Sequence, residues 1–299
     1  GMNTPSGGSD SPGGEAIGGD VPPQFEISID VQSPAPGALL PIGRSVSLSG
    51  VLSLSDDRSP QNISLELITI RPGDTVASPP LELPVTQEGR FEIELDLVAG
   101  AHACVLSASY QGVEAYVSHV IRLDDFVSVQ GVQLSWASAP YRYFGINLPN
   151  LIPWLYQLSE EDRRDVLRGL LSDWRSSGVS VLRLFVGSTE GDWAILSAPQ
   201  ELNEELLAIL DLIIEEAGYS NFKLILTLGD AHGERGGWRS YLRWAEILSP
   251  RLEDDAFFYQ VGPSRSIFID FIQLLPARVN SITQIAYRDE PTILGWELL

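Results

Sequence analysis

Two charged residues interrupt apolar runs that otherwise resemble buried strands. Arg183 lies in residues 179–187 and Glu297 lies in residues 292–299. An unpaired charge is costly to bury, so each side chain needs a partner of opposite charge or contact with water. An arginine beside a carboxylate orients it and lowers its pKa, which suits acid–base chemistry. Arg183 could instead be a surface residue on an edge strand. For Glu297 we favour a structural acid paired within the sheet, with Arg183 as candidate partner, over a catalytic carboxylate.

Tryptophans follow three successive apolar runs. Trp154 comes after the first run, Trp193 after the second and Trp238 after the third. Flat aromatic faces stack on the apolar faces of sugar rings and offer a large contact area at low entropic cost. Tryptophan is also a common core residue, so each of the three could serve packing instead. Their repeated position favours a sugar-binding site.

The loop after the third run also carries polar groups. Asp230, His232 and Glu234 lie within residues 229–237. Such a loop can line a binding site, and we take Asp230 and His232 as candidate substrate-binding residues. Their spacing is not specific for a metal ion, so we expect no metal.

Strands and helices alternate from residue 126 onwards. Ser159 opens a capping box at the start of the first long helix, and Gly178 ends that helix. Successive strand–helix steps predict a parallel sheet with helical crossovers. In α/β barrels the chemistry lies at the C-terminal ends of such strands, although the pattern does not distinguish half a barrel from an open sheet. The predicted strands are residues 141–147, 179–186, 222–228 and 292–299, and the predicted helices begin at residues 159, 203, 239 and 264, the last kinked by Pro276.

Residues 24–123 have a different pattern. Short runs alternate apolar and polar residues with a period of two, and turn residues separate them. This pattern predicts an antiparallel β-sandwich, which we expect to be immunoglobulin-like. Gln111 and Gly112 would form a hairpin turn. The runs are residues 25–29, 45–49, 63–70, 91–97, 104–110 and 113–123.

Composition narrows the classes of function. The chain has 299 residues, of which 40 are acidic and 19 basic, and its formal net charge is −21. Such acidity argues against nucleic acid and anionic membranes as partners but is compatible with a neutral polysaccharide. No apolar stretch is long enough to span a membrane. Glycine-rich phosphate loops are absent, so we expect no nucleotide and no other cofactor.

Two further features concern the N-terminal part. Residues 1–22 are mostly Gly, Ser, Pro and Asp, which predicts a flexible tether. Cys104 is the only cysteine and lies in an apolar run, which predicts a buried, inert thiol.

Several segments together resemble the endo-β-1,4-mannanases of glycoside hydrolase family 5. The resemblance covers about residues 126–299 and implies a (β/α)8 TIM-type barrel. Arg183 stands where that family has its active-site arginine, and Asn147, at the end of the first strand, becomes a candidate substrate-binding residue. The loop Asp230-Ala-His232 departs from the Asn-Asn-Trp often found in the family. The matching segments are residues 126–134, 143–147, 178–183, 236–244, 278–283 and 287–298.

The resemblance also implies where two catalytic glutamates stand. In the family, Trp-Glu-Leu-x precedes Asn-Glu-Pro, whose glutamate is the acid/base, and a second glutamate on the seventh strand is the nucleophile. Leu299 occupies the x position, so both glutamates would lie beyond it. A retaining glycosidase needs two carboxyl groups roughly 5 Å apart. We therefore expect a barrel truncated after about four strands and a chain without hydrolase activity.

The expected function is that of a glycosidase-like protein for β-mannan or a similar β-1,4 polysaccharide, secreted or at the cell surface, with its leader absent from this chain. The alternative is a non-catalytic carbohydrate-binding or surface-interaction protein that uses the sandwich, with Tyr110 and Tyr116 as exposed aromatics. In a third hypothesis the sandwich is only a spacer that holds the barrel off a surface. Half a barrel would leave its first and fourth strands unpaired, and such edges favour self-association.

Overall fold

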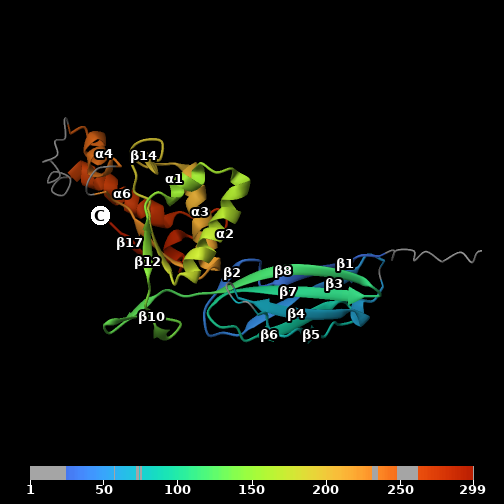
Figure 1. Ribbon diagram of the computed structural model, residues 1–299. Helices are drawn as coiled ribbons and strands as arrows, with labels where there is room; N and C mark the ends of the chain where they lie inside the picture. Colours follow the sequence, from blue (N-terminus) through green and yellow to red (C-terminus); the bar gives the residue numbers. More distant parts are fainter. Residues whose placement is uncertain are drawn as a thin grey trace, which may run out of the picture.

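The structure is a computed structural model and describes residues 25–56, 58–71, 74, 76–230, 235–247 and 262–298. It has a β-sandwich, blue to cyan-green in Figure 1, followed by an α/β part coloured from green to red. The predicted tether, residues 1–22, lies outside the described residues.

Two sheets pack face to face in the sandwich. One has the strand order β1-β3-β6 and is antiparallel, and the other has the order β2-β8-β7-β4-β5, in which only β2 pairs in parallel. Apolar side chains at alternate positions of both sheets form one core. The bounds are β1 (Ile27–Ser33), β2 (Ala38–Leu40), β3 (Val46–Leu54), β4 (Ser64–Ile70), β5 (Leu81–Leu83), β6 (Arg90–Leu95), β7 (Gly100–Tyr110) and β8 (Val113–Leu123), with a 3-10 turn, η1 (Pro60–Asn62).

The six predicted runs each overlap a strand of this sandwich: β1, β3, β4, β6, β7 and β8. Gln111 and Gly112 form the predicted hairpin turn between β7 and β8, with φ of 48° and 84°. Cys104 is buried, and burial raises the pKa of its thiol to about 11, which confirms the prediction of a buried thiol. The sequence did not predict β2 and β5, because three residues are too few to establish an alternating pattern.

A four-stranded parallel sheet forms the centre of the α/β part. Its strands lie side by side in chain order, β12-β13-β16-β17. A barrel has this sequential order, whereas in a doubly wound sheet the order reverses at the first strand. The order therefore favours half a barrel over an open doubly wound sheet, and we call residues 145–298 the half-barrel. The bounds are β12 (Gly145–Leu148), β13 (Val181–Phe185), β16 (Lys223–Thr227) and β17 (Ile293–Glu297).

Helices cross between these strands and cover one face of the sheet. Ser159 accepts a hydrogen bond from the Asp162 N–H at 3.2 Å, which confirms the predicted cap, and Gly178 follows α2 with φ of 84°. Apolar residues of the helices and of alternate strand positions share one core. The bounds are α1 (Leu151–Tyr156), α2 (Glu160–Ser176), α3 (Glu204–Tyr219), α4 (Gly237–Trp244), α6 (Gly262–Ala277) and the 3-10 turn η2 (Tyr287–Asp289).

The structure corrects two predicted elements. The first strand begins at Gly145 rather than residue 141 and is half exposed, because β12 is an edge of the described sheet. The last helix, which the sequence predicted over residues 264–284 with a kink at Pro276, instead ends at Ala277, directly after this proline. Small elements were also missed: the sheet β9 (Ser128–Gln130), β10 (Gln133–Trp136) and β11 (Ala139–Pro140), and the hairpin β14 (Leu196–Ala198) and β15 (Glu201–Leu202).

Asp211 of α3 explains why the chain turns after α6. Its buried carboxylate accepts hydrogen bonds from the Tyr287 hydroxyl at 2.5 Å and from Arg278 Nη2 at 3.0 Å. It also accepts from the backbone N–H of Ser281 at 3.1 Å and from the Ser281 hydroxyl at 2.8 Å. Burial, and then the charge of Asp211, raise the pKa of Tyr287, so this hydroxyl stays a proton donor. Asp211 thus fixes the segment that leads into β17.

Two buried ion pairs join the sandwich to the half-barrel. Arg122, in β8, donates from Nη2 to both carboxylate oxygens of Glu290, at 2.8 and 2.9 Å, and from Nη1 to the Thr292 hydroxyl at 3.2 Å. Arg122 is 1% exposed and Glu290 is fully buried. Just beyond β8, Asp124 accepts from Lys223 Nζ at 2.7 and 2.9 Å. Burial lowers the pKa of Lys223, and the carboxylate of Asp124 opposes this effect.

The close approach of the two parts requires a glycine. A Cβ added at Gly218 of α3 would lie 1.9 Å from Arg122 Nη1, so any larger residue would displace the guanidinium. Nearby, the backbone N–H of Ala101 donates to Asn221 Oδ1 at 3.2 Å. No helix in the described part of the chain is long and apolar enough to cross a membrane.

Candidate functional site

Four polar side chains, one from each strand of the half-barrel, form a cluster. Arg183 donates from Nε to Glu297 Oε2 at 2.6 Å and from Nη1 to Asn147 Oδ1 at 2.9 Å, and its Nη2 lies 2.5 Å from the same Glu297 oxygen. The Thr227 hydroxyl also donates to Glu297 Oε2, at 2.6 Å. We call Asn147, Arg183, Thr227 and Glu297 the polar cluster. The expected pairing of Arg183 with Glu297 is therefore present.

Strand geometry places this cluster on the face that the helices leave open. Successive strand residues point to opposite faces of a sheet. Ile146 and Leu148 pack against the apolar core beneath the helices, so Asn147 between them points the other way. Leu182 and Leu184 flank Arg183 in the same manner. Both Arg183 and Glu297 keep more than a third of their side-chain surface exposed, so water or a ligand reaches the pair.

A cavity of about 600 Å³ lies among the loops that follow β12, β13 and β16. Trp154 and Trp193 both line it, and Trp154 is 41% exposed. The Trp193 ring packs edge-on against Tyr156, with ring centroids 5.4 Å apart, which fixes its orientation. The hydroxyl of Tyr156 donates to Glu205 at 2.7 Å, and this hydrogen bond raises the pKa of Tyr156. The remaining lining residues are Asn150, Pro153, Gln157, Ser188, Glu190 and Arg235.

Arg235 connects the third loop to the first. Its Nη1 donates to the Pro149 carbonyl at 3.1 Å, its Nη2 donates to the Asn150 side chain, and its guanidinium carbon lies 5.1 Å from the centroid of the Phe185 ring. The backbone N–H of Arg235 donates to Asp230 at 2.8 Å. Asp230 therefore shapes this loop.

Two glycines allow the third loop to pack this closely. Gly236 and Gly237 both have positive φ, at 93° and 49°. A Cβ at Gly236 would lie 2.2 Å from Thr189 Oγ1, and one at Gly237 would lie 2.3 Å from the Asp230 carbonyl oxygen. The Gly-Gly pair is thus a requirement of the local backbone.

The predicted site residues have different outcomes. Asn147 belongs to the polar cluster and, with Trp154, also lines a second cavity of about 340 Å³. Trp238 is 3% exposed and lies in the core beneath the helices, so it presents no open ring face to a sugar. This corrects its assignment as a substrate-binding residue. His232 falls within residues 231–234, outside the described residues.

Thr227 and Arg235 were missed as site residues. Thr227 could have been found, because it occupies the last position of an apolar strand, where a polar residue faces the site. The signal for Arg235 was weaker: a single basic residue in an acidic loop, directly before two glycines. No group of histidine, cysteine and acidic side chains suited to a metal ion occurs among the residues that the structure describes.

A sequentially ordered parallel sheet with helices on one face and polar side chains at its strand ends defines an α/β half-barrel. Residues 124–299 match the family model described as "GH family 5 beta-mannosidase-like". The chain therefore belongs to the β-mannosidase-like proteins of glycoside hydrolase family 5.

Individual relatives agree with this assignment. The chain is 30% identical over 200 residues to "Putative mannan endo-1,4-beta-mannosidase 4" of Arabidopsis thaliana, covering 66% of this chain and 47% of that protein. It is 29% identical over 175 residues to "Mannan endo-1,4-beta-mannosidase 5" of Solanum lycopersicum, covering 58% and 41%. The chain thus spans less than half the length of each. A family 5 mannosidase crystal structure from Rhizomucor miehei has a similar fold, with a TM-score of 0.51, 20% identity, and coverage of 58% of this chain and 48% of the other.

Proposed function

We propose that this chain provides the N-terminal half of the substrate cleft of a retaining glycosidase for β-mannan or a similar β-1,4 polysaccharide. The observation that supports this most is the polar cluster, which gathers one side chain from each strand and whose Asn147 lines a cavity together with Trp154. Relatives named as mannan endo-1,4-β-mannosidases indicate the polysaccharide.

In this proposal Glu297 is a positioning acid. Its Oε2 accepts hydrogen bonds from Arg183 and Thr227. These two donors and the ion pair with Arg183 fix the position of the carboxylate within the cluster. A retaining mechanism requires one carboxyl group as acid and a second as nucleophile. We propose that the polar cluster orients neighbouring groups and sugar hydroxyls, and that the 299-residue chain by itself binds β-mannan without hydrolysing it.

Mannohexaose is expected to bind the 299-residue chain, and Trp154→Ala is expected to weaken binding about tenfold because it removes a stacking face. Isothermal titration calorimetry measures this. Tyr116→Ala is the matched control, because this aromatic is exposed on the sandwich. Unchanged affinity in the Trp154 variant together with a loss of affinity in the Tyr116 variant would support the alternative, a carbohydrate-binding sandwich.

A hydrolysis assay with mannan tests the role of Glu297. Mannan hydrolysis by the chain, abolished by Glu297→Gln, would overturn the positioning role of Glu297.

The sheet of the half-barrel suggests self-association. Among the described residues, β12 and β17 each pair with a strand on one side only. Unpaired strand edges recruit other strands. Phe144, directly before β12, is 64% exposed and adds an apolar contact surface.

Sedimentation velocity is expected to show a dimer or larger species that increases with concentration. Phe144→Lys should shift the equilibrium towards monomer, because it places a charge beside the edge. Val132→Lys, at an exposed turn between β9 and β10, is the control and should change nothing. A monomer at every concentration would contradict the proposal.

We also propose that the sandwich is immunoglobulin-like. Its first, third and sixth strands form one sheet, and its fourth, seventh and eighth strands lie together in the other. Immunoglobulin domains divide their corresponding strands between two sheets in the same way. We also propose that the protein is secreted or lies at the cell surface, because this location fits a polysaccharide substrate.

A further inference from the structure

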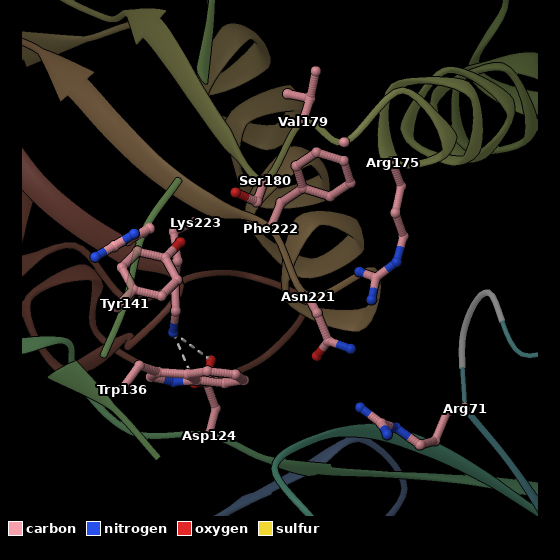
Figure 2. Close-up of a pocket in the computed structure, with 12 residues that line it drawn as sticks. Arg71, Asp124, Trp136, Tyr141, Arg175, Val179, Ser180, Asn221, Phe222 and Lys223 are labelled. Carbon is pink, nitrogen blue, oxygen red and sulfur yellow. Dashed lines mark hydrogen bonds and ion pairs between the residues drawn. The ribbon is translucent and has the colours of Figure 1, made fainter. Parts of the chain in front are cut away.

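Three arginines line a cavity between the sandwich and the half-barrel. Arg71 follows β4 of the sandwich, Arg142 precedes β12, and Arg175 lies in the last turn of α2. All three line one cavity of about 430 Å³. Figure 2 shows the guanidinium groups of Arg71 and Arg175 directed into the same space, with the Asn221 side chain between them.

The charges of these arginines are not balanced locally. Among the described residues, no carboxylate lies within ion-pair distance of any of the three. Asp124 also lines the cavity, but Lys223 already holds both of its oxygens. A cationic cavity is unexpected in a chain of net charge −21, since acidic partners are plentiful.

Two observations indicate that the cavity suits a hydrogen-bond acceptor. Nε of Arg71 is buried and has no hydrogen-bond partner among the described residues. Arg175 donates from Nη1 to the Ser220 carbonyl, an uncharged partner. Burial and then the nearby charge of Arg71 lower the pKa of Arg175, whereas the exposed Asp74 acts in the opposite direction. An anion between the two guanidinium groups would relieve their repulsion and accept the unused donors.

Aromatic residues also line the cavity. These residues are Trp136, Tyr141 and Phe222. The Trp136 ring lies 5.2 Å from Lys223 Nζ, and its indole N–H donates to Asp124 at 2.8 Å, so the buried ion pair fixes this ring. A cavity that combines guanidinium donors with flat aromatic surface can hold an anionic group attached to a small organic body.

We propose that this cavity binds an oxyanion group, a carboxylate or phosphate, through Arg71 and Arg175, with the charge of Arg142 elsewhere on the lining adding to the attraction. Planar guanidinium groups donate paired hydrogen bonds to such groups and remain charged at all physiological pH values. A free inorganic anion and a sugar acid share this chemistry. Because the ligand contacts residues of both parts, binding also stabilises the junction between them.

Isothermal titration calorimetry of the whole chain at low ionic strength tests the site, with inorganic phosphate and sodium glucuronate as probes and glucose as the neutral control. We expect phosphate, glucuronate or both to bind and glucose not to bind. Preferential binding of phosphate would identify a free anion as the ligand, and preferential binding of glucuronate a sugar acid. Arg71→Gln and Arg175→Gln should each weaken binding about tenfold or more, because each removes charge-assisted donors.

Arg44→Gln is the matched control, because it removes the same charge from an exposed position of the sandwich that does not line the cavity. Arg142→Gln is the second test variant: Arg142 is exposed, so its loss should weaken binding without unfolding the chain. The bound probe should also raise the melting temperature of the parent chain but not of Arg71→Gln. Absence of binding by both anions, or equal affinity in all four variants, would overturn the proposal.

Discussion

Replacing Arg122 with methionine is expected to lower the free energy of unfolding by about 3–5 kcal/mol. The substitution removes the guanidinium that donates to both oxygens of Glu290 and leaves this fully buried carboxylate without its charge partner. Thr292 loses a donor at the same time. Glu290 lies just before β17. The substitution should therefore destabilise the half-barrel, although Arg122 belongs to the sandwich.

Urea unfolding followed by tryptophan fluorescence measures this effect. All seven tryptophans lie between residues 136 and 296, so their emission reports on the part of the chain that follows the sandwich. Arg90→Met is the control, because Arg90 forms an exposed pair with Glu88 and such pairs contribute little. The double variant Arg122→Met/Glu290→Gln should recover part of the loss, since no buried charge remains unpaired. Equal midpoints for Arg122→Met and Arg90→Met would show that the pair does not couple the two parts.

Asp211→Asn is expected to destabilise the chain by about 3–4 kcal/mol, because hydrogen bonds to a charged acceptor contribute about 1.5–3 kcal/mol each and several are weakened together. The amide keeps the size of the carboxylate but loses its charge and directs an NH2 group at donors. Arg278, Tyr287 and Ser281 then compete for a single neutral oxygen.

Chemical denaturation of Asp211→Asn and Glu204→Gln gives the matched comparison. Glu204 contacts the same Arg278 at 2.5 Å, but its side chain is 67% exposed, so its replacement should have little effect. Tyr287→Phe removes one donor and should have an intermediate effect, about 1–2 kcal/mol. Similar losses for Asp211→Asn and Glu204→Gln would mean that the buried network does not hold the approach to β17.

The elements of this fold were largely predictable because their patterns are local. Alternation with a period of two indicated the long strands of the sandwich, and the residue types at Ser159 and Gly178 located the ends of α2. The partnership of Arg183 with Glu297 was predictable for another reason. Each is a charge within an apolar run, and strands of one parallel sheet bring such residues together at the same edge, here across the intervening β16.

Burial of particular aromatic residues was harder to predict. Trp154, Trp193 and Trp238 occupy equivalent positions along the sequence, yet only the first two line the cavity. Trp238, Tyr241 and Leu242 lie on α4 at the spacing of one helical face. All three side chains therefore point towards the core. That helical spacing could have predicted the burial of Trp238. We assigned this tryptophan to the site because it follows a strand, as Trp154 and Trp193 do.

Contacts between distant segments had no signal in the sequence. Arg122 and Glu290 are separated by 168 positions, and neither stands in a pattern that marks it as paired. The same holds for the arginines of the cavity, which come from three separate segments. Such contacts depend on how the sandwich and the half-barrel dock, and local periodicity carries no information about docking.

The buried pairs at this junction limit how the gene can be rearranged. Arg122 ends the sandwich, whereas its acceptor Glu290 belongs to the half-barrel, and Lys223 reaches back to Asp124 in the same way. A recombination event at residue 123 would give the recipient protein a half-barrel with a buried glutamate and no arginine to match it. The sandwich is therefore not an interchangeable module. We expect the two parts to be inherited as a unit, with substitutions at Arg122 and Glu290 tolerated only as a matched pair.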